Sequence, residues 1–166
     1  TGFYVSRIET ATVGNAGGSS VQGRGTGLDA AAVTLVPPGG EPLSALADGM
    51  IRFDGTTLYA RFDLGGAATG TWGAEVIDAT TATTQVVPAA LQVIAGRGPE
   101  LRCHLEGPST AGALRALDNQ LICENLGDAD LDAPFVQIEA TEAALPAPDG
   151  TVARHRAWLA AAQGWP

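Results

Sequence analysis

The chain has 166 residues and a formal net charge of −9, with 45% hydrophobic and 16% charged residues. All nine cations are arginines and none of them cluster, which argues against binding to the phosphate backbone of a nucleic acid. No run of about eighteen apolar residues occurs, so we expect no insertion into a membrane. The chain begins at Thr1 without a leader-like segment, and we expect a processed product or a piece of a longer protein.

Residues 1–96 consist of short apolar runs that are separated by turn residues about every ten positions. The stretch 57–64 alternates most clearly, with Leu58, Ala60 and Phe62 on one face. Strands are predicted at 3–9, 19–23, 33–36, 50–53, 57–64, 71–77 and 90–94. Gly23–Gly27 is predicted to form a tight turn. This pattern, which no helical period interrupts, predicts an all-β fold with a β-sandwich over residues 1–96.

Five stretches of this segment follow one another in a recognisable order. They are the opening strand 3–9, the glycine-flanked strand 17–25, the alternating strand 57–62, the run 70–76 and the final strand 91–93. In this succession residues 3–94 resemble an IPT/TIG domain, the immunoglobulin-like fold of plexins and many bacterial surface proteins. The resemblance implies a sandwich with a structural role at a cell surface.

Residues 97–148 show a second pattern with strands at 100–106, 119–125 and 135–139. The turn Asn125-Leu126-Gly127-Asp128 follows the second of these strands. The segment is similar to the first half of CARDB and DUF11-like modules of bacterial adhesion proteins, which carry an Asn-x-Gly-Asp turn at this point. Three strands bury little surface. We therefore expect completion by another chain, by further sequence of a parent protein, or by packing on the first unit.

Residues 149–166 are predicted to form a short helix or linker, with the helix at 152–163 and Gly164 closing it. Three tryptophans occur in the chain. Trp72 shares a strand face with small apolar residues and is predicted to lie in the core. Trp158 and Trp165 are predicted to contact a neighbouring domain or subunit, since exposed aromatic side chains are common anchors of interfaces.

Cys103 and Cys123 lie on consecutive strands that we expect to pair. A disulfide between them suits a secreted β-sandwich. The alternative is two buried free thiols. His104 is expected to point away from Cys103, and no second Cys/His pair has ligand spacing, which argues against zinc.

Glu124, Asp128, Asp130 and Asp132 form an acidic loop. Calcium binding at Asp128, Asp130 and Asp132 requires several of their oxygens to converge. The loop lacks the Asp-x-Asp-x-Asp-Gly spacing of a calcium loop, and the alternative is a solvated loop. We otherwise expect no cofactor.

Sequence motifs for nucleotide binding or catalysis are weak or absent. The Gly23-x-Gly25-x-Gly27 run imitates a dinucleotide loop, but the segment after it is short, strand-like and stopped by two prolines. His104 and His155 lie in different predicted elements, and no Gly-x-Ser-x-Gly elbow occurs. We therefore expect a protein that is not an enzyme.

The sequence predicts a non-catalytic structural or adhesion segment of a secreted or cell-surface protein. It would act as a spacer or assembly module through protein–protein contacts, which include strand complementation or homo-oligomer formation. The alternatives are a carbohydrate- or calcium-binding module and an accessory domain of a secreted enzyme.

Overall fold

The structure of the chain is a computed structural model that describes residues 2–9, 12–108, 119–132, 135–146 and 152–160. The chain divides into two compact units, Thr1–Asp130 and Leu131–Pro166. Among the described residues, all regular structure is extended except for one 3-10 helix, η1 (Leu28–Ala30). The predicted all-β class is confirmed.

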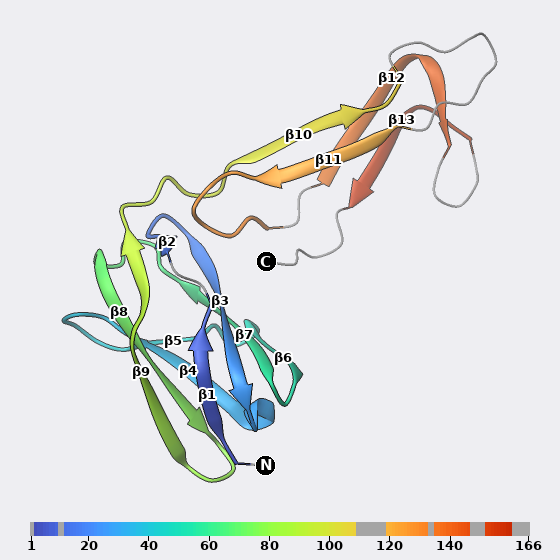
Figure 1. Cartoon of the computed structure of the whole chain (residues 1–166). Helices are drawn as coiled ribbons and strands as arrows, with labels where there is room; N and C mark the ends of the chain where they lie inside the picture. Colours follow the sequence, from blue (N-terminus) through green and yellow to red (C-terminus); the bar gives the residue numbers. More distant parts are fainter. Residues whose placement is uncertain (1, 10–11, 109–118, 133–134, 147–151, 161–166) are drawn as a thin grey trace. The chain divides into compact units, whose positions relative to one another are not determined.

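The first unit contains a β-sandwich of two sheets (Figure 1). One sheet has the strand order β1-β3-β7-β6, and the other has the order β2-β9-β8-β4-β5. All neighbours are antiparallel except β2, which runs parallel to β9. The strands are β1 (Tyr4–Ile8), β2 (Thr12–Gly14), β3 (Gly18–Thr26), β4 (Ala31–Val36), β5 (Leu43–Ser44), β6 (Met50–Asp54), β7 (Thr57–Asp63), β8 (Gly70–Asp78) and β9 (Thr83–Ile94).

The order of these strands is that of an immunoglobulin domain. If the strands are lettered in chain order as A, A′, B, C, C′, D, E, F and G, the sheets become A–B–E–D and A′–G–F–C–C′. An immunoglobulin sandwich places A, B, E and D on one sheet and C, F and G on the other. The predicted immunoglobulin-like sandwich is therefore confirmed from its topology.

The core lies between the two sheets. On β7, Leu58, Ala60 and Phe62 are buried, as their alternation predicted. Trp72 on β8 is also buried, and its indole N–H donates to the backbone carbonyl of Ala68 at 2.9 Å. Burying a large apolar side chain in this way stabilises the folded state by about 1.5–3 kcal/mol relative to leaving it exposed. The same cluster contains Val5, Val13, Val21, Leu28, Ala31, Val33, Leu35, Leu64, Ala74, Val76, Ala90, Leu91 and Val93.

The prediction of a tight turn at Gly23–Gly27 was wrong. β3 continues to Thr26, and the chain turns only at Gly27, which has a φ of 67°, and at η1. A Cβ atom at Gly25 would clash with the backbone carbonyl oxygen of Tyr4 in β1. This glycine therefore permits two strands to approach closely. A strand, β4, follows η1, so the run does not open a helix that could hold a nucleotide phosphate.

Two short strands and half of a long one were not predicted. β2 has three residues and β5 has two, too few for an alternating pattern to be recognised. β9 begins at Thr83 rather than at 90 and runs through Pro88. Its register with β8 shifts opposite Gly73, which lets the strand pass the proline.

Beyond the sandwich, the first unit contains the hairpin of β10 (Leu101–Glu106) and β11 (Gln120–Asn125). Both strands were predicted. In the described part of the chain they form a two-stranded sheet of their own.

The second unit contains β12 (Phe135–Pro146) and β13 (Val152–Ala160), which pair in antiparallel fashion. The predicted helix at 152–163 was wrong over the described residues 152–160. A free helix of about twelve residues is marginal in water because it gains only local hydrogen bonds. As a strand, the same segment pairs with β12 along its length, a non-local partner that its helix-like spacing did not reveal. The predicted division into 1–96, 97–148 and 149–166 stays a prediction.

Candidate functional site

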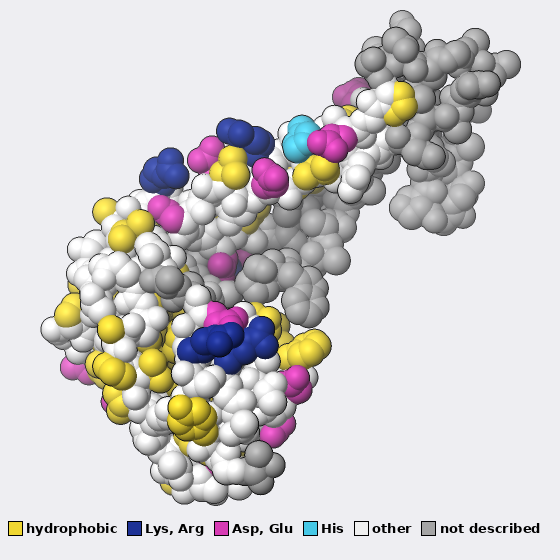
Figure 2. Space-filling view, in the orientation of Figure 1, with side chains coloured by type: hydrophobic (Ala, Val, Ile, Leu, Met, Phe, Trp, Pro, Cys, Tyr) yellow, Lys and Arg dark blue, Asp and Glu magenta, His cyan; other side chains and the backbone are white. Residues whose placement is uncertain are grey.

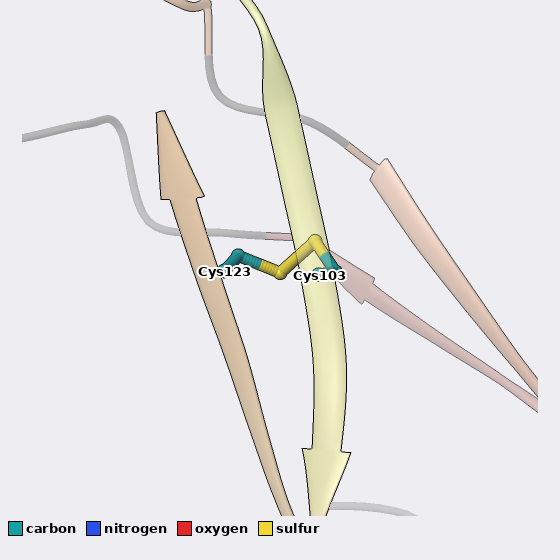
Figure 3. Close-up of a disulfide and its surroundings, with 2 residues drawn as sticks. All are labelled: Cys103 and Cys123. Carbon is teal, nitrogen blue, oxygen red and sulfur yellow. A yellow bond between two sulfur atoms is a disulfide. The ribbon is translucent and has the colours of Figure 1, made fainter. Parts of the chain in front are cut away.

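A disulfide joins the two strands of the β10–β11 hairpin (Figure 3). Cys103 lies directly opposite Cys123 in the register, and their Cα atoms are 4.1 Å apart. This separation belongs to the closely spaced class of antiparallel pair. The predicted disulfide is confirmed, and the alternative of two free thiols was wrong. The ring Nε2 of His104 lies 3.3 Å from a carboxylate oxygen of Glu106, and among the described residues no three His, Cys, Asp or Glu side chains are placed to share a metal ion with it.

The hairpin contributes no side chain to the core of the sandwich. Every residue of β10 is exposed, including Leu101 and Leu105, and no residue of β11 is buried. A two-stranded hairpin of this kind is marginally stable in water by itself. We conclude that the disulfide is the main constraint that keeps its two strands paired.

Asp128 ties the base of this hairpin to the sandwich. Its carboxylate accepts the backbone N–H groups of Arg97 and Gly98, each at 2.9 Å. Its backbone carbonyl accepts the N–H of Gly14 in β2 at 2.8 Å. The hydrogen bond from the Arg97 N–H, together with that from Gly98, lowers the pKa of Asp128 below its ordinary value. The carboxylate thus acts as an ionised structural acceptor.

Two further residues complete this arrangement, which we call the base clamp: Asn125, Asp128 and Asp130. The side-chain oxygen of Asn125 accepts the N–H groups of Glu100 at 3.1 Å and Gly127 at 3.0 Å. The Asp130 carboxylate accepts the hydroxyl of Ser20 at 2.7 Å and lies 3.7 Å from the Arg61 guanidinium. The clamp therefore connects the hairpin to strands of both sheets.

These contacts bear on the calcium candidates Asp128, Asp130 and Asp132. The first two carboxylates already accept hydrogen bonds from groups of the protein, and Asp132 belongs to the second unit. In the ranges that the structure describes, no three His, Cys, Asp or Glu side chains are placed to share a metal ion. Calcium binding stays an alternative that solution measurements must test.

The open edges of the sandwich are protected to different degrees. At the edge strand β1, the side-chain amide of Gln85 accepts the N–H of Val5 at 2.8 Å and donates to its carbonyl at 2.7 Å. β2 and β5 are too short to offer a long edge, and the Gly14 N–H of β2 is bound to Asp128. β6 is five residues long, as is β1, and it exposes Ile51 and Phe53.

The outer face of the β1-β3-β7-β6 sheet carries a polar network. Glu9 accepts a hydrogen bond from Arg7 at 2.8 Å and pairs with Arg24 at 3.2 Å. The bond from Arg7, with a further contribution from Arg24, lowers the pKa of Glu9. Figure 2 shows basic side chains over this sheet and apolar side chains near its β6 side. The network lies on the β1–β3 half of the sheet, and β7 adds Arg61, which pairs with Asp130.

A hollow of about 340 Å³ lies beside this sheet, lined by Leu46, Ala47, Asp48, Gly49 and Arg61. It opens widely to solvent. Its lining contains one carboxylate, that of Asp48, but no histidine, serine or cysteine, so it offers no pair of a hydroxyl or thiol nucleophile with an imidazole base.

The remaining predicted site residues are placed only in part. Trp158 lies in β13, where it pairs in register with Gln137, and His155 lies on the same strand. Trp165 lies outside the described residues. Their contact with a partner stays a prediction. The sequence did not point to Gln85 as a structural contact. It did not point to Asn15 either, whose side-chain amide donates to the Ala67 carbonyl at 2.7 Å and accepts the Gly96 N–H at 2.9 Å. A lone amide in a polar run carries no signal of its distant partner.

Comparisons with known proteins add little to this picture. No protein-family profile matches the chain, and no curated protein matches it. One solved structure that matches is the crystal structure of Dpr2 Ig1-Ig2 in complex with DIP-Theta Ig1-Ig3. The identity is 10%, the TM-score is 0.36, and the match covers 95% of this chain and 56% of that one. Among the described residues, no helix is long and apolar enough to cross a membrane.

Proposed function

We propose that the chain is a non-catalytic structural or adhesion segment of a secreted or cell-surface protein. It acts as a spacer or assembly module through protein–protein contacts. The observation that carries this proposal is the number of strand edges that are free among the described residues. Both hairpins are two-stranded sheets, and the sandwich adds the edge of β6. Free edges pair readily with strands of another chain.

The disulfide supports the proposed compartment. Cys103 and Cys123 are exposed on a hairpin without a core, where the reducing agents of a cytosol would reach the bond. A secreted or surface location preserves it. The IPT/TIG and CARDB resemblances point to the same setting and remain part of the proposal.

The base clamp supports a spacer role. Asn125, Asp128 and Asp130 use side-chain acceptors to bind one segment of the chain to another, and a substrate is not needed to satisfy them. Such side-chain-to-backbone hydrogen bonds hold a connection in place. The clamp thus serves to join modules.

Size-exclusion chromatography with light scattering tests this function on the oxidised full chain at several loading concentrations. The expected result is an average mass that rises above the monomer as the concentration increases. A mass that stays at the monomer value under all conditions would count against an assembly module and would favour the ligand-binding alternatives.

The binding alternative is tested by calorimetric titration with calcium chloride and by a glycan array. We expect no heat beyond dilution with calcium, because protein donors already occupy the Asp128 and Asp130 carboxylates. Saturable binding of either ligand would replace the assembly proposal with a binding module.

A further inference from the structure

The Cys103–Cys123 disulfide lies on an exposed part of the β10–β11 hairpin. Both cysteines are exposed, and the leucines on either side of Cys103 along its strand are exposed as well, Leu101 to 40% and Leu105 to 57%. A thiolate can attack a disulfide only where it has access to a sulfur atom, and exposed disulfides are the ones that exchange most readily. The bond is therefore open to attack while the sandwich stays folded.

The base of the hairpin is held by contacts that do not involve the disulfide. The Leu126 N–H donates to the Glu100 carbonyl at 2.8 Å, just beyond the last pair of the ladder. The Asp128 N–H donates to the Gly98 carbonyl at 3.2 Å, and the Asp128 carboxylate accepts the Gly98 N–H at 2.9 Å. The side-chain oxygen of Asn125 adds a bond to the Glu100 N–H at 3.1 Å. Reduction of the disulfide removes none of these bonds.

This base keeps the two thiols close together after the bond has opened. Cys103 follows the held Glu100 closely in the chain, and Cys123 precedes Leu126 equally closely. Two groups that are joined by a short tether meet at an effective concentration in the millimolar range or above. Each thiol therefore remains the preferred partner of the other, and the bond can form again.

Opening the bond changes the surface of the hairpin. Leu105 and Leu121 lie opposite each other in the register, on the same face as the two cysteines, because side chains alternate along a strand. With the strands joined, these side chains form one apolar face. A two-stranded hairpin without a core is marginally stable, so the strands above the base part when the disulfide is lost.

We propose that Cys103–Cys123 is a reversible thiol–disulfide exchange site, whose substrate is a dithiol. Exchange opens the hairpin above its base, while the base clamp and the sandwich stay folded. The proposal adds an activity to the chain and does not rest on assembly, since a monomer and an oligomer can both undergo this exchange.

The exchange proceeds in two steps. A thiolate of the dithiol attacks the sulfur of one cysteine, the bond between Cys103 and Cys123 breaks, and the other cysteine leaves as a thiolate. The second thiolate of the dithiol then attacks its own sulfur in the mixed disulfide and releases the first cysteine. Two electrons pass from the dithiol, which becomes a disulfide, to the cysteine pair, and the two protons of the dithiol reach the cysteines through water. The reverse steps restore the bond.

The first test measures how fast the oxidised full chain is reduced by dithiothreitol in native buffer, with maleimide labelling and mass spectrometry as the readout. The competing mechanism is reduction only after global unfolding. Gly25→Ala separates the two, because a Cβ atom there collides with the Tyr4 carbonyl within the sandwich, far from the hairpin in sequence. Gly39→Ala is the matched control, and urea melts measure the stability of each variant. Gln85→Ala takes the place of Gly25→Ala if the latter does not fold.

We expect wild type, Gly25→Ala and Gly39→Ala to be reduced at the same rate. Reduction that requires unfolding would instead be faster in Gly25→Ala by about fivefold to about 150-fold, in step with its loss of stability, and would overturn the proposal. Thioredoxin in place of dithiothreitol distinguishes the sources of the dithiol. Reduction by both supports a protein dithiol, and reduction by dithiothreitol alone supports a small one.

The second test measures the return of the bond when the reduced chain is treated with oxidised glutathione. Wild type is compared with the Asn125→Ala, Asp128→Ala double variant, which weakens the base, and with Glu41→Gln as an exposed control. We expect wild type and control to re-form the disulfide without accumulating a glutathione adduct, and the double variant to accumulate about tenfold more adduct. A wild type in which the adduct persists would show that the site does not exchange reversibly.

Discussion

The side chain of Gln85 on β9 replaces a missing strand for Val5 on β1. Its amide oxygen accepts the Val5 N–H at 2.8 Å, and its amide nitrogen donates to the Val5 carbonyl at 2.7 Å. An amide side chain has the same donor and acceptor as a peptide group, so one residue satisfies both backbone groups of the edge. The contact also links the two sheets of the sandwich, since β1 and β9 belong to different sheets.

Replacing Gln85 with alanine should therefore destabilise the sandwich. We expect a loss of about 2 kcal/mol in the free energy of unfolding, because two partly buried backbone groups lose their partner. Gln85→Glu retains the acceptor and loses the donor. Its free energy of unfolding should lie between those of the wild type and Gln85→Ala. Urea denaturation measures the effect, with Thr84→Ala as a control at an exposed neighbouring position. A Gln85→Ala protein as stable as the control would show that the cap is dispensable.

Gly25 is predicted to tolerate no side chain. A Cβ atom there would collide with the Tyr4 carbonyl, and the rigid backbone of β1 must move to relieve it. We expect Gly25→Ala to lower stability by about 1–3 kcal/mol, the usual cost of overpacking. Gly39→Ala is the matched control, because nothing lies within 4 Å of a Cβ atom at that position. Equal stability of the two variants in thermal melts would contradict the close approach of β1 and β3.

Reduction of the disulfide should release the hairpin but not the sandwich. The bond closes a loop with a sequence separation of 20, for which chain entropy gives about 3 kcal/mol. We expect amides of β10 and β11 to exchange with solvent much faster in the Cys103→Ala, Cys123→Ala double variant, while those of β7 keep their protection. Hydrogen exchange with mass spectrometry measures both regions together. Retained protection of the hairpin would show that its strands pair without the bond.

The base clamp should fail in acid. Because the folded-state pKa of Asp128 lies below its ordinary value, its contribution to stability is fully present above about pH 3.9. That contribution is lost as the pH falls through the lower pKa of the folded state. NMR of the Arg97 and Gly98 amides should follow this titration. Asp128→Asn should remove the pH dependence of these signals, and Glu41→Gln, an exposed loop change, should leave it in place.

The sequence predicted local features well where a single strand displays them. The alternation of Leu58, Ala60 and Phe62 identified β7 and its buried face, and Cys103 and Cys123 could be paired because their strands are consecutive. Features that are defined by a residue far away in the sequence were not predicted. The strand at Val152–Ala160 is defined by pairing with β12, and the role of Gln85 is defined by Val5, which lies 80 residues away.

The same distinction explains the glycine-rich stretch and the acidic loop. Gly25 looks like a turn residue in sequence because the strand that approaches it is not adjacent there. In the local sequence Asp128 and Asp130 look like cation ligands, because no hydrogen-bond donor for them is evident nearby. The donors, which are the Arg97 and Gly98 amides and the Ser20 hydroxyl, come from distant segments of the chain. A local pattern shows which residues can bind something, and the fold decides what they bind.

Hydrogen exchange of the oxidised full chain at two protein concentrations, about 10 µM and about 1 mM, tests strand-edge assembly most directly, because it reads each described strand edge in one experiment. We predict that amides of β6 (Met50–Asp54) gain protection at the higher concentration, while the Val5 amide of β1 (Tyr4–Ile8), already bound by Gln85, does not change. Exchange that is identical at both concentrations in each described edge strand would contradict the account.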